Sequence, residues 1–218
     1  MQLTHSETML LTAERYAPAG GLRSSNIKLP HNGVKVDAAV LSCALLCAAL
    51  LDCEARGAVQ LEVDHTHEKV LFGLFGRREV ATLYASPGNP HHYQVGSIEA
   101  RLCDLVRGGE IKVMDLVHAL LSKDAHEPWS LTPDLVKDGL MRRNLVRHDT
   151  EKRLLWTTQA VSVPNSTLAQ LRADVDLQIA HRFDHAKQHR PQLWSLLNEA
   201  IRGAHSARRK WDDNFNDR

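Results

Sequence analysis

The stretch Ala38 to Arg56, AAVLSCALLCAALLDCEAR, decides the fold of this chain. It is apolar on nearly every side of a helix, Asp37 can cap its first turn, and Gly57 ends it. A helix without a polar face has to be surrounded by other elements. Its apolar run from Ala38 to Leu51 is shorter than the roughly 20 residues of a membrane span, so we expect a central core helix and no transmembrane segment.

Further helices are predicted on both sides of this core helix. Apolar residues recur at helical spacing in several segments, and Pro at a first helical turn or Asn at an end marks some of the boundaries. The expected helices span residues 7–14, 98–106, 113–121, 132–144, 168–179 and 191–204, and a Gly/Pro/Ser-rich connection occupies residues 17–33.

Short strands complete the fold. Residues 58–63 alternate apolar and polar side chains, 70–75 and 79–85 are strand-like, and 145–158 is predicted as a hairpin that turns through 148–152. The fold class is therefore mostly α: a helical bundle with a central apolar helix, surrounding amphipathic helices and small β-hairpins. We expect one domain over residues 1–218, with flexible termini at 1–6 and 211–218.

The balanced charge of the chain gives no overall attraction to a strongly charged partner. Basic and acidic residues number 27 and 26, so any binding to nucleic acid or anionic membrane must come from a local patch. Cys43, Cys47, Cys53 and Cys103 lie in apolar patterns with no CxxC pair, which predicts small hydrophobic side chains in a reduced compartment. The first residues do not form a secretory signal, and we expect a cytoplasmic location.

No motif predicts catalysis or a cofactor. The sequence has no GxSxG, Walker or GxGxxG motif, so we expect a protein that is not an enzyme, with no catalytic residues and no cofactor. Two histidine groups could bind metal: the HxH pair His65 and His67 in a predicted turn, and His181, His185 and His189 on one helical face. A solvated turn and a solvated helix end explain both groups more simply, so no metal site is predicted.

The most informative segment is the predicted helix and hairpin between residues 131 and 158. Six basic residues against three acidic ones between Leu135 and Trp156 make it the densest positive patch of the chain. The candidate anion- or lipid-binding residues are Arg142, Arg143, Arg147, Lys152 and Arg153, and the candidate membrane or oligomer contacts are Leu154, Leu155 and Trp156.

Three interpretations of this segment stay open. A winged-helix domain over residues 98–158 would place its helix in the DNA major groove and the basic hairpin on phosphates. A membrane-surface hairpin would place arginines on lipid phosphates and Trp156 at the headgroup boundary. In the third, the hairpin only closes the core and its arginines are solvated. The carboxylates of Asp134 and Asp138, on the helix that would enter the major groove, argue against nucleic acid.

The hairpin also predicts self-association. Leu154, Leu155 and Trp156 are consecutive, so on a strand they cannot all face one side. Large apolar groups on both faces of a two-stranded hairpin need a cover. We expect a homo-oligomer, a dimer, whose contact includes residues 145–158. The competing explanation is that the last helix, with Trp194 and Ile201, covers the second face.

The order of these elements resembles the Golgi phosphoprotein family of phosphatidylinositol 4-phosphate-binding adaptors, which has bacterial members. The similarity spans about Glu7 to Ala207, and Leu140 to Trp156 resembles the family's helix–hairpin unit most closely. Its other quoted passages are ETMLLTA (7–13), ARGAVQLE (55–62), SIEARLCDLV (97–106), VMDLVHALL (113–121) and VPNS (163–166).

This resemblance implies a helical bundle bearing a hairpin for oligomer contacts or membrane docking. The family's lipid pocket uses one aromatic residue and three arginines, and the corresponding residues here are Asp37, Leu46, Ser130 and Pro133. None of these is aromatic or basic, so the resemblance supports the fold better than the ligand. The expected function is a non-catalytic peripheral adaptor that binds anionic lipid headgroups or a protein partner through the hairpin, with a winged-helix nucleic-acid-binding protein as the alternative.

Overall fold

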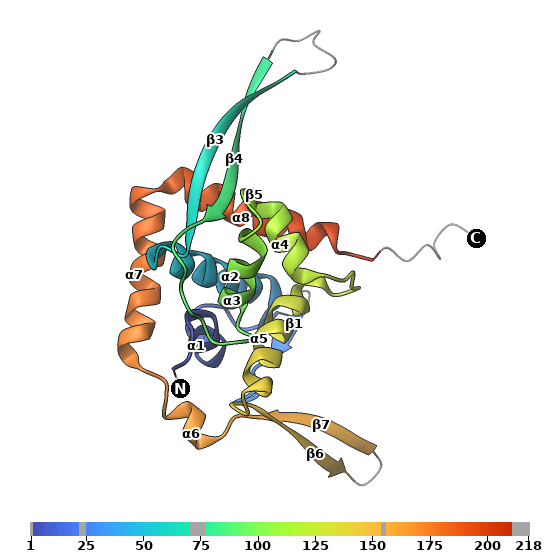
Figure 1. Ribbon diagram of the computed structural model, residues 1–218. Helices are drawn as coiled ribbons and strands as arrows, with labels where there is room; N and C mark the ends of the chain where they lie inside the picture. The colour runs from blue at the N-terminus through green and yellow to red at the C-terminus, as the bar shows by residue number, and fades with distance from the viewer. Residues whose placement is uncertain (1, 22–24, 70–76, 154–155, 211–218) are drawn as a thin grey trace, which may run out of the picture.

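Helix α2 (Ala38–Ala55) runs through the middle of the molecule in the computed structural model, which describes residues 2–21, 25–69, 77–153 and 156–210 (Figure 1). The Asp37 carboxylate accepts a hydrogen bond from the Val40 backbone N–H at 3.0 Å, which confirms the predicted cap. Within the described residues, α2 alone is long and apolar enough to cross a membrane, and 72% of it is buried inside the fold. The predicted central core helix is confirmed.

Other helices surround α2 on several sides (Figure 1). Helices α1, α3, α5, α7 and α8 all contact it, and α4 packs on α3 and α8. Pro191 opens α8 as predicted, whereas the single helix expected over 168–179 is divided into α6 and α7. The helices are α1 (His5–Leu11), η1 (Ala13–Arg15), α3 (Ile98–Val106), α4 (Val113–Leu121), η3 (Pro128–Ser130), α5 (Leu131–Arg142), α6 (Asn165–Leu168), α7 (Ala173–His189) and α8 (Pro191–Ala207).

Small antiparallel sheets lie at the edges of the helical body. Strand β4 (Arg77–Pro87) pairs with β3 (Val59–Lys69) and with β5 (Ile111–Lys112), while β1 (Asn26–Lys28) pairs with β2 (Lys35–Asp37). Residues 64–68, predicted as a connection, belong to β3, because β3 pairs with β4 over its whole length, from Val59 opposite Pro87 to Lys69 opposite Arg77. The strand predicted at 70–75 lies outside the described residues.

These sheets refine the predicted fold class. Helices form the largest part of the described residues, so the prediction of a mostly helical protein is confirmed. The antiparallel sheets make it α-plus-β rather than a pure bundle.

The start of the chain is packed into the fold. We expected residues 1–6 to be flexible, but Leu3, Thr4, His5 and Ser6 are buried. The reason is a capping box: Thr4 accepts from the backbone of Glu7, and the Glu7 carboxylate accepts from the Thr4 backbone N–H at 3.0 Å. Residues 211–218, also predicted to be flexible, lie outside the described residues.

Candidate functional site

The predicted hairpin is present, and its root follows from how α5 ends. Asn144 adopts a positive φ of 57°, a backbone conformation that Asn tolerates better than most residues. The chain then reverses, and Leu145 and Val146 are buried against the core. The Thr167 hydroxyl donates to the Leu145 carbonyl at 2.8 Å. The root of the hairpin is therefore tied to the helical body.

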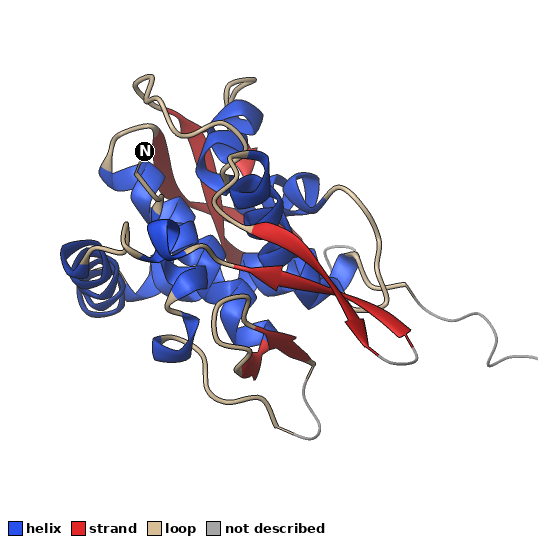
Figure 2. Cartoon of the chain, turned by 90° about the horizontal axis from the view of Figure 1, so that it is seen from below, coloured by secondary structure: helices blue, strands red, loops and turns tan. Residues whose placement is uncertain are grey.

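Beyond the root, the two strands extend away from the helices (Figure 1, Figure 2). Strand β6 (Arg147–Arg153) pairs antiparallel with β7 (Trp156–Ser162), from Arg147 opposite Ser162 to Arg153 opposite Trp156. The turn predicted at 148–152 is wrong, because those residues lie within β6. Charged residues suit a turn, but they suit equally a strand with little protein around it.

The predicted basic residues fall into three places. Arg142 and Arg147 are exposed at the root of the hairpin. Lys152 and Arg153 occupy the last two positions of β6, roughly 20 Å from Arg147 at the usual strand rise. Trp156 is the first residue of β7, and Leu154 and Leu155 lie outside the described residues. The fifth basic residue, Arg143, is elsewhere.

Arg143 points into the protein and not toward the hairpin surface. Its guanidinium forms an ion pair with the Glu7 carboxylate, and the two side chains are only 6% and 1% exposed. Its Nε also donates to the Gly139 carbonyl at 3.2 Å. Burial raises the pKa of Glu7, and the Arg143 charge opposes that rise. The prediction of Arg143 as a surface phosphate contact is corrected, because it joins α5 to α1.

A second buried carboxylate, that of Glu99, contacts α1 next to Glu7. Glu99, at the start of α3, is fully buried and accepts from the Ser6 backbone N–H at 2.9 Å and from the Ser6 hydroxyl at 3.1 Å. Burial, followed by the nearby Glu7 charge, raises the pKa of Glu99 to about 7. The sequence indicated nothing special here, since Glu99 looks like an ordinary helix-start residue.

A third buried acid links α2 to α7 and α1. The Asp52 side chain is 1% exposed and forms an ion pair with Arg182. It also accepts from the Nε of Arg56, which lies 3.0 Å from both carboxylate oxygens. Burial alone would raise the pKa of Asp52, but His5, Arg182 and Arg56 together lower it. Burial lowers the pKa of His5 to about 4. The only hint in the sequence is a lone acid at the end of an apolar helix.

The positions that correspond to the family's lipid contacts do not form a cationic pocket. Asp37 caps α2, Leu46 is fully buried in the core, and Pro133 is buried in the first turn of α5. The hydroxyl of Ser130 donates to the Glu127 carbonyl at 2.9 Å. A phosphate at this place would meet no basic side chain from these four positions.

A cavity of about 350 Å³ lies between α2, α7 and α8. Phe183 and Trp194 form an aromatic wall, with ring centroids 5.4 Å apart, and the Lys187 ammonium lies 5.3 Å from the Trp194 ring. Exposed Arg202 also lines the cavity, over an apolar floor that includes Cys43. The cavity combines apolar and cationic groups, but it is separate from the hairpin.

The two predicted histidine groups lie on α7 and on the β3–β4 ribbon. His181, His185 and His189 line one face of α7, with neighbouring ring centroids 6.3 and 4.9 Å apart. His65 instead pairs with Glu79 across the β3–β4 ribbon, at 2.7 Å. In the part of the chain that the structure describes, no three His, Cys, Asp or Glu side chains gather to hold a metal.

Comparison with known proteins assigns nothing further. No protein-family model matches the chain, and no curated protein sequence matches it. Function is therefore argued from the residues and their placement.

Proposed function

We propose that the protein is a non-catalytic peripheral adaptor that docks on an anionic lipid surface through the β6–β7 hairpin. One observation carries the proposal: the strands extend clear of the helical body, and their sequence concentrates cations beside consecutive large apolar residues (Figure 1). A divergent membership of the Golgi phosphoprotein family is part of the same proposal. It rests on the order of elements and not on that family's lipid pocket.

The outer end of the hairpin carries the first contact in this proposal. Lys152 and Arg153 bind lipid phosphates, while Leu154, Leu155 and Trp156 enter the boundary between headgroups and acyl chains. Each basic residue near an anionic surface contributes about 1 kcal/mol, and salt screens that attraction. Arg142 and Arg147 reach the same surface when the hairpin lies along it, and Arg143 takes no part.

Helix α8 was the competing candidate for covering the second face of the hairpin. Helix α8, which carries Trp194 and Ile201, packs on α2, α4 and β4 (Figure 1). These contacts support a cover other than α8 for the second face of the hairpin. Either a membrane or a second copy of the chain can cover the apolar hairpin residues. In a dimer through residues 145–158, Trp156→Asp should convert the light-scattering mass from two chains to one, whereas a wild-type mass of one chain would refute the dimer.

Liposome co-sedimentation tests the lipid proposal. The wild-type chain should pellet with vesicles of phosphatidylcholine and phosphatidylserine and stay in solution with phosphatidylcholine alone. Lys152→Glu with Arg153→Glu should weaken binding to the anionic vesicles at least about tenfold. The matched control is Lys123→Glu with Lys210→Glu, which reverses two exposed charges that follow the ends of α4 and α8 and do not belong to the hairpin.

The control variant shows whether the vesicles attract the hairpin specifically or any basic residue of the chain. Equal recovery with neutral and anionic vesicles would refute the proposal, and so would equal losses in the two double variants. Leu154→Ser with Leu155→Ser, which adds no charge, should also reduce binding while leaving the salt dependence unchanged. Docking on a protein partner instead would give no vesicle binding in any of these chains.

A winged-helix protein remains the alternative, since α5 is followed directly by the hairpin. The exposed positions of α5 include Asp134 and Asp138, and Lys137 is engaged with Asp134 at 3.2 Å. Two carboxylates facing DNA phosphates are unfavourable. A gel-shift series with micromolar or tighter DNA binding that weakens steeply with salt would reverse this ranking.

A further inference from the structure

Two cysteines that are 50 positions apart in the sequence meet inside the molecule. Cys53, in the last turn of α2, is fully buried, and Cys103, in α3, is partly buried. Their sulfur atoms are 3.9 Å apart, and both thiols are free. A disulfide needs about 2.05 Å between the sulfur atoms, so side-chain rotation and a small shift of the two helices would bring them into bonding distance.

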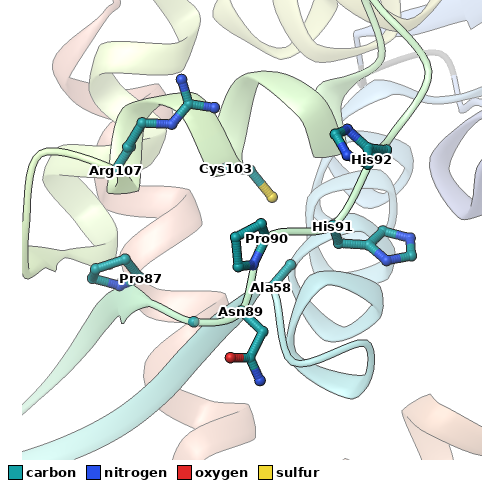
Figure 3. Close-up of a pocket in the computed structure, with 9 residues that line it drawn as sticks. Ala58, Pro87, Asn89, Pro90, His91, His92, Cys103 and Arg107 are labelled. Carbon is teal, nitrogen blue, oxygen red and sulfur yellow. The ribbon is translucent and has the colours of Figure 1, made fainter.

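Cys103 also borders a cavity of about 180 Å³ between α3 and the loop that follows β4. The close-up shows the Cys103 sulfur directed toward Pro90, with His91, His92 and Arg107 around the same space (Figure 3). A cavity of this size admits water or another small polar solute. Small oxidants can therefore reach Cys103, while Cys53 lies behind it.

The surroundings make the two thiols chemically different. The hydrogen bond with Cys53 lowers the pKa of Cys103, and the Arg107 charge acts in the same direction. Partial burial, Asp104 and Glu99 oppose this lowering without reversing it. The Cys53 thiol donates to the Glu99 carbonyl at 3.9 Å. Its hydrogen bond with Cys103 and its burial both raise the pKa of Cys53. Thiolate forms first at Cys103, on the side that faces the cavity.

We propose that Cys103 and Cys53 form a peroxide-sensitive dithiol, in which Cys103 is oxidised first and Cys53 resolves the product into a disulfide. The Cys103 thiolate attacks one oxygen of hydrogen peroxide, the O–O bond breaks, and the leaving hydroxide takes a proton to become water. Cys53 then attacks the sulfur of the Cys103 sulfenic acid, an S–S bond forms, and a second water leaves with the proton of the Cys53 thiol. Two electrons pass from the two thiols to the peroxide.

The other two cysteines supply an internal comparison. Cys43 and Cys47 are buried one turn apart on α2, and burial raises the pKa of both thiols. Neither has the combination of a neighbouring thiol from another element and the cavity that Cys103 borders. They should stay reduced while the dithiol oxidises.

The experiment treats the reduced full-length protein with hydrogen peroxide, quenches samples over time, and maps thiols by mass spectrometry without reduction. The expected product loses two hydrogen atoms, links the Cys53 and Cys103 peptides, and leaves Cys43 and Cys47 available for alkylation after unfolding. Cys103 should oxidise roughly tenfold faster than Cys43 or Cys47. A disulfide that joins two chains, or equal oxidation of all four cysteines, would overturn the proposal.

Two variants separate the roles. Cys53→Ser should let the Cys103 sulfenic acid accumulate, where dimedone traps it, and Cys103→Ser should leave Cys53 reduced. Circular dichroism checks that each variant is folded. The linked peptides in the wild-type chain test the proposal even where a variant does not fold. Rapid sulfenic acid formation at Cys53 in Cys103→Ser would contradict the order of the two steps.

Discussion

Replacing Glu99 by Gln should change how the stability of the protein depends on pH. The Glu99 carboxyl is fully buried and accepts from the backbone N–H and the hydroxyl of Ser6. A Gln side chain keeps both contacts, because its oxygen can accept from the Ser6 N–H and its amide can donate to the Ser6 hydroxyl. The substitution therefore removes a titrating group with little change of shape.

The magnitude follows from the raised pKa. Burial, followed by the Glu7 charge, raises the pKa of Glu99 from 4.5 to about 7. Between these values the folded protein binds a proton at Glu99 that the unfolded chain has lost, so folding loses stability as pH rises through this window. A difference of about 2.5 pKa units corresponds to about 3 kcal/mol lost between pH 4.5 and pH 7, and Glu99→Gln does not suffer this loss.

Urea denaturation of both proteins at a series of pH values measures the effect. Near pH 4.5 the two free energies of unfolding should be similar, and above pH 7.5 the variant should be more stable by about 3 kcal/mol. His5, with a pKa lowered to about 4, adds the opposite pH dependence to both proteins, so only their difference isolates Glu99. Glu110→Gln, at an exposed position, should follow the wild type. A difference between Glu99→Gln and wild type that stays constant from pH 4.5 to pH 8 would refute the reasoning.

Two further substitutions test the packing beneath the hairpin. Arg143→Met leaves Glu7 buried without its cation, so the free energy of unfolding at pH 7 should fall by about 3–5 kcal/mol in urea denaturation. The double variant with Glu7→Gln should regain most of this stability, and a loss below about 1 kcal/mol in Arg143→Met would contradict the buried pair. Gly139→Ala should lower the free energy of unfolding by about 1–3 kcal/mol although Ala favours helices, because the added Cβ would meet the Gly96 carbonyl oxygen at 2.5 Å. Gly108→Ala, whose added Cβ meets nothing within 4 Å, should stay within about 1 kcal/mol of wild type in the same assay.

Helices with a strong apolar period or a clear boundary residue were predictable from sequence. The core helix, its Asp37 cap, and the start of the last helix at Pro191 are all confirmed. These features depend on local physics, namely helical periodicity, a capping oxygen and the missing N–H of proline. The short strand Asn26–Lys28 was missed because its pairing with Lys35–Asp37 depends on a partner outside the local window.

The candidate site was predictable only in part, since local sequence does not say which charges are exposed. Arg142 and Arg143 are adjacent, yet Arg142 is exposed and Arg143 is paired with Glu7 from the start of the chain. The same limit applies to Cys53 and Cys103, whose apolar surroundings suggested inert side chains. Their proximity depends on how α2 packs on α3.

The buried ion pair also bears on how the hairpin could act. Arg143 holds the end of α5 against α1, and Asn144 follows it directly. Leu145 is fixed in turn by the Thr167 hydroxyl from α6. The root of the hairpin is therefore held by α1 through Arg143 and by α6 through Leu145. A force on the outer part of the hairpin acts on this fixed root. In the proposed adaptor, a hairpin with a firm root can dock on a surface without loss of the fold.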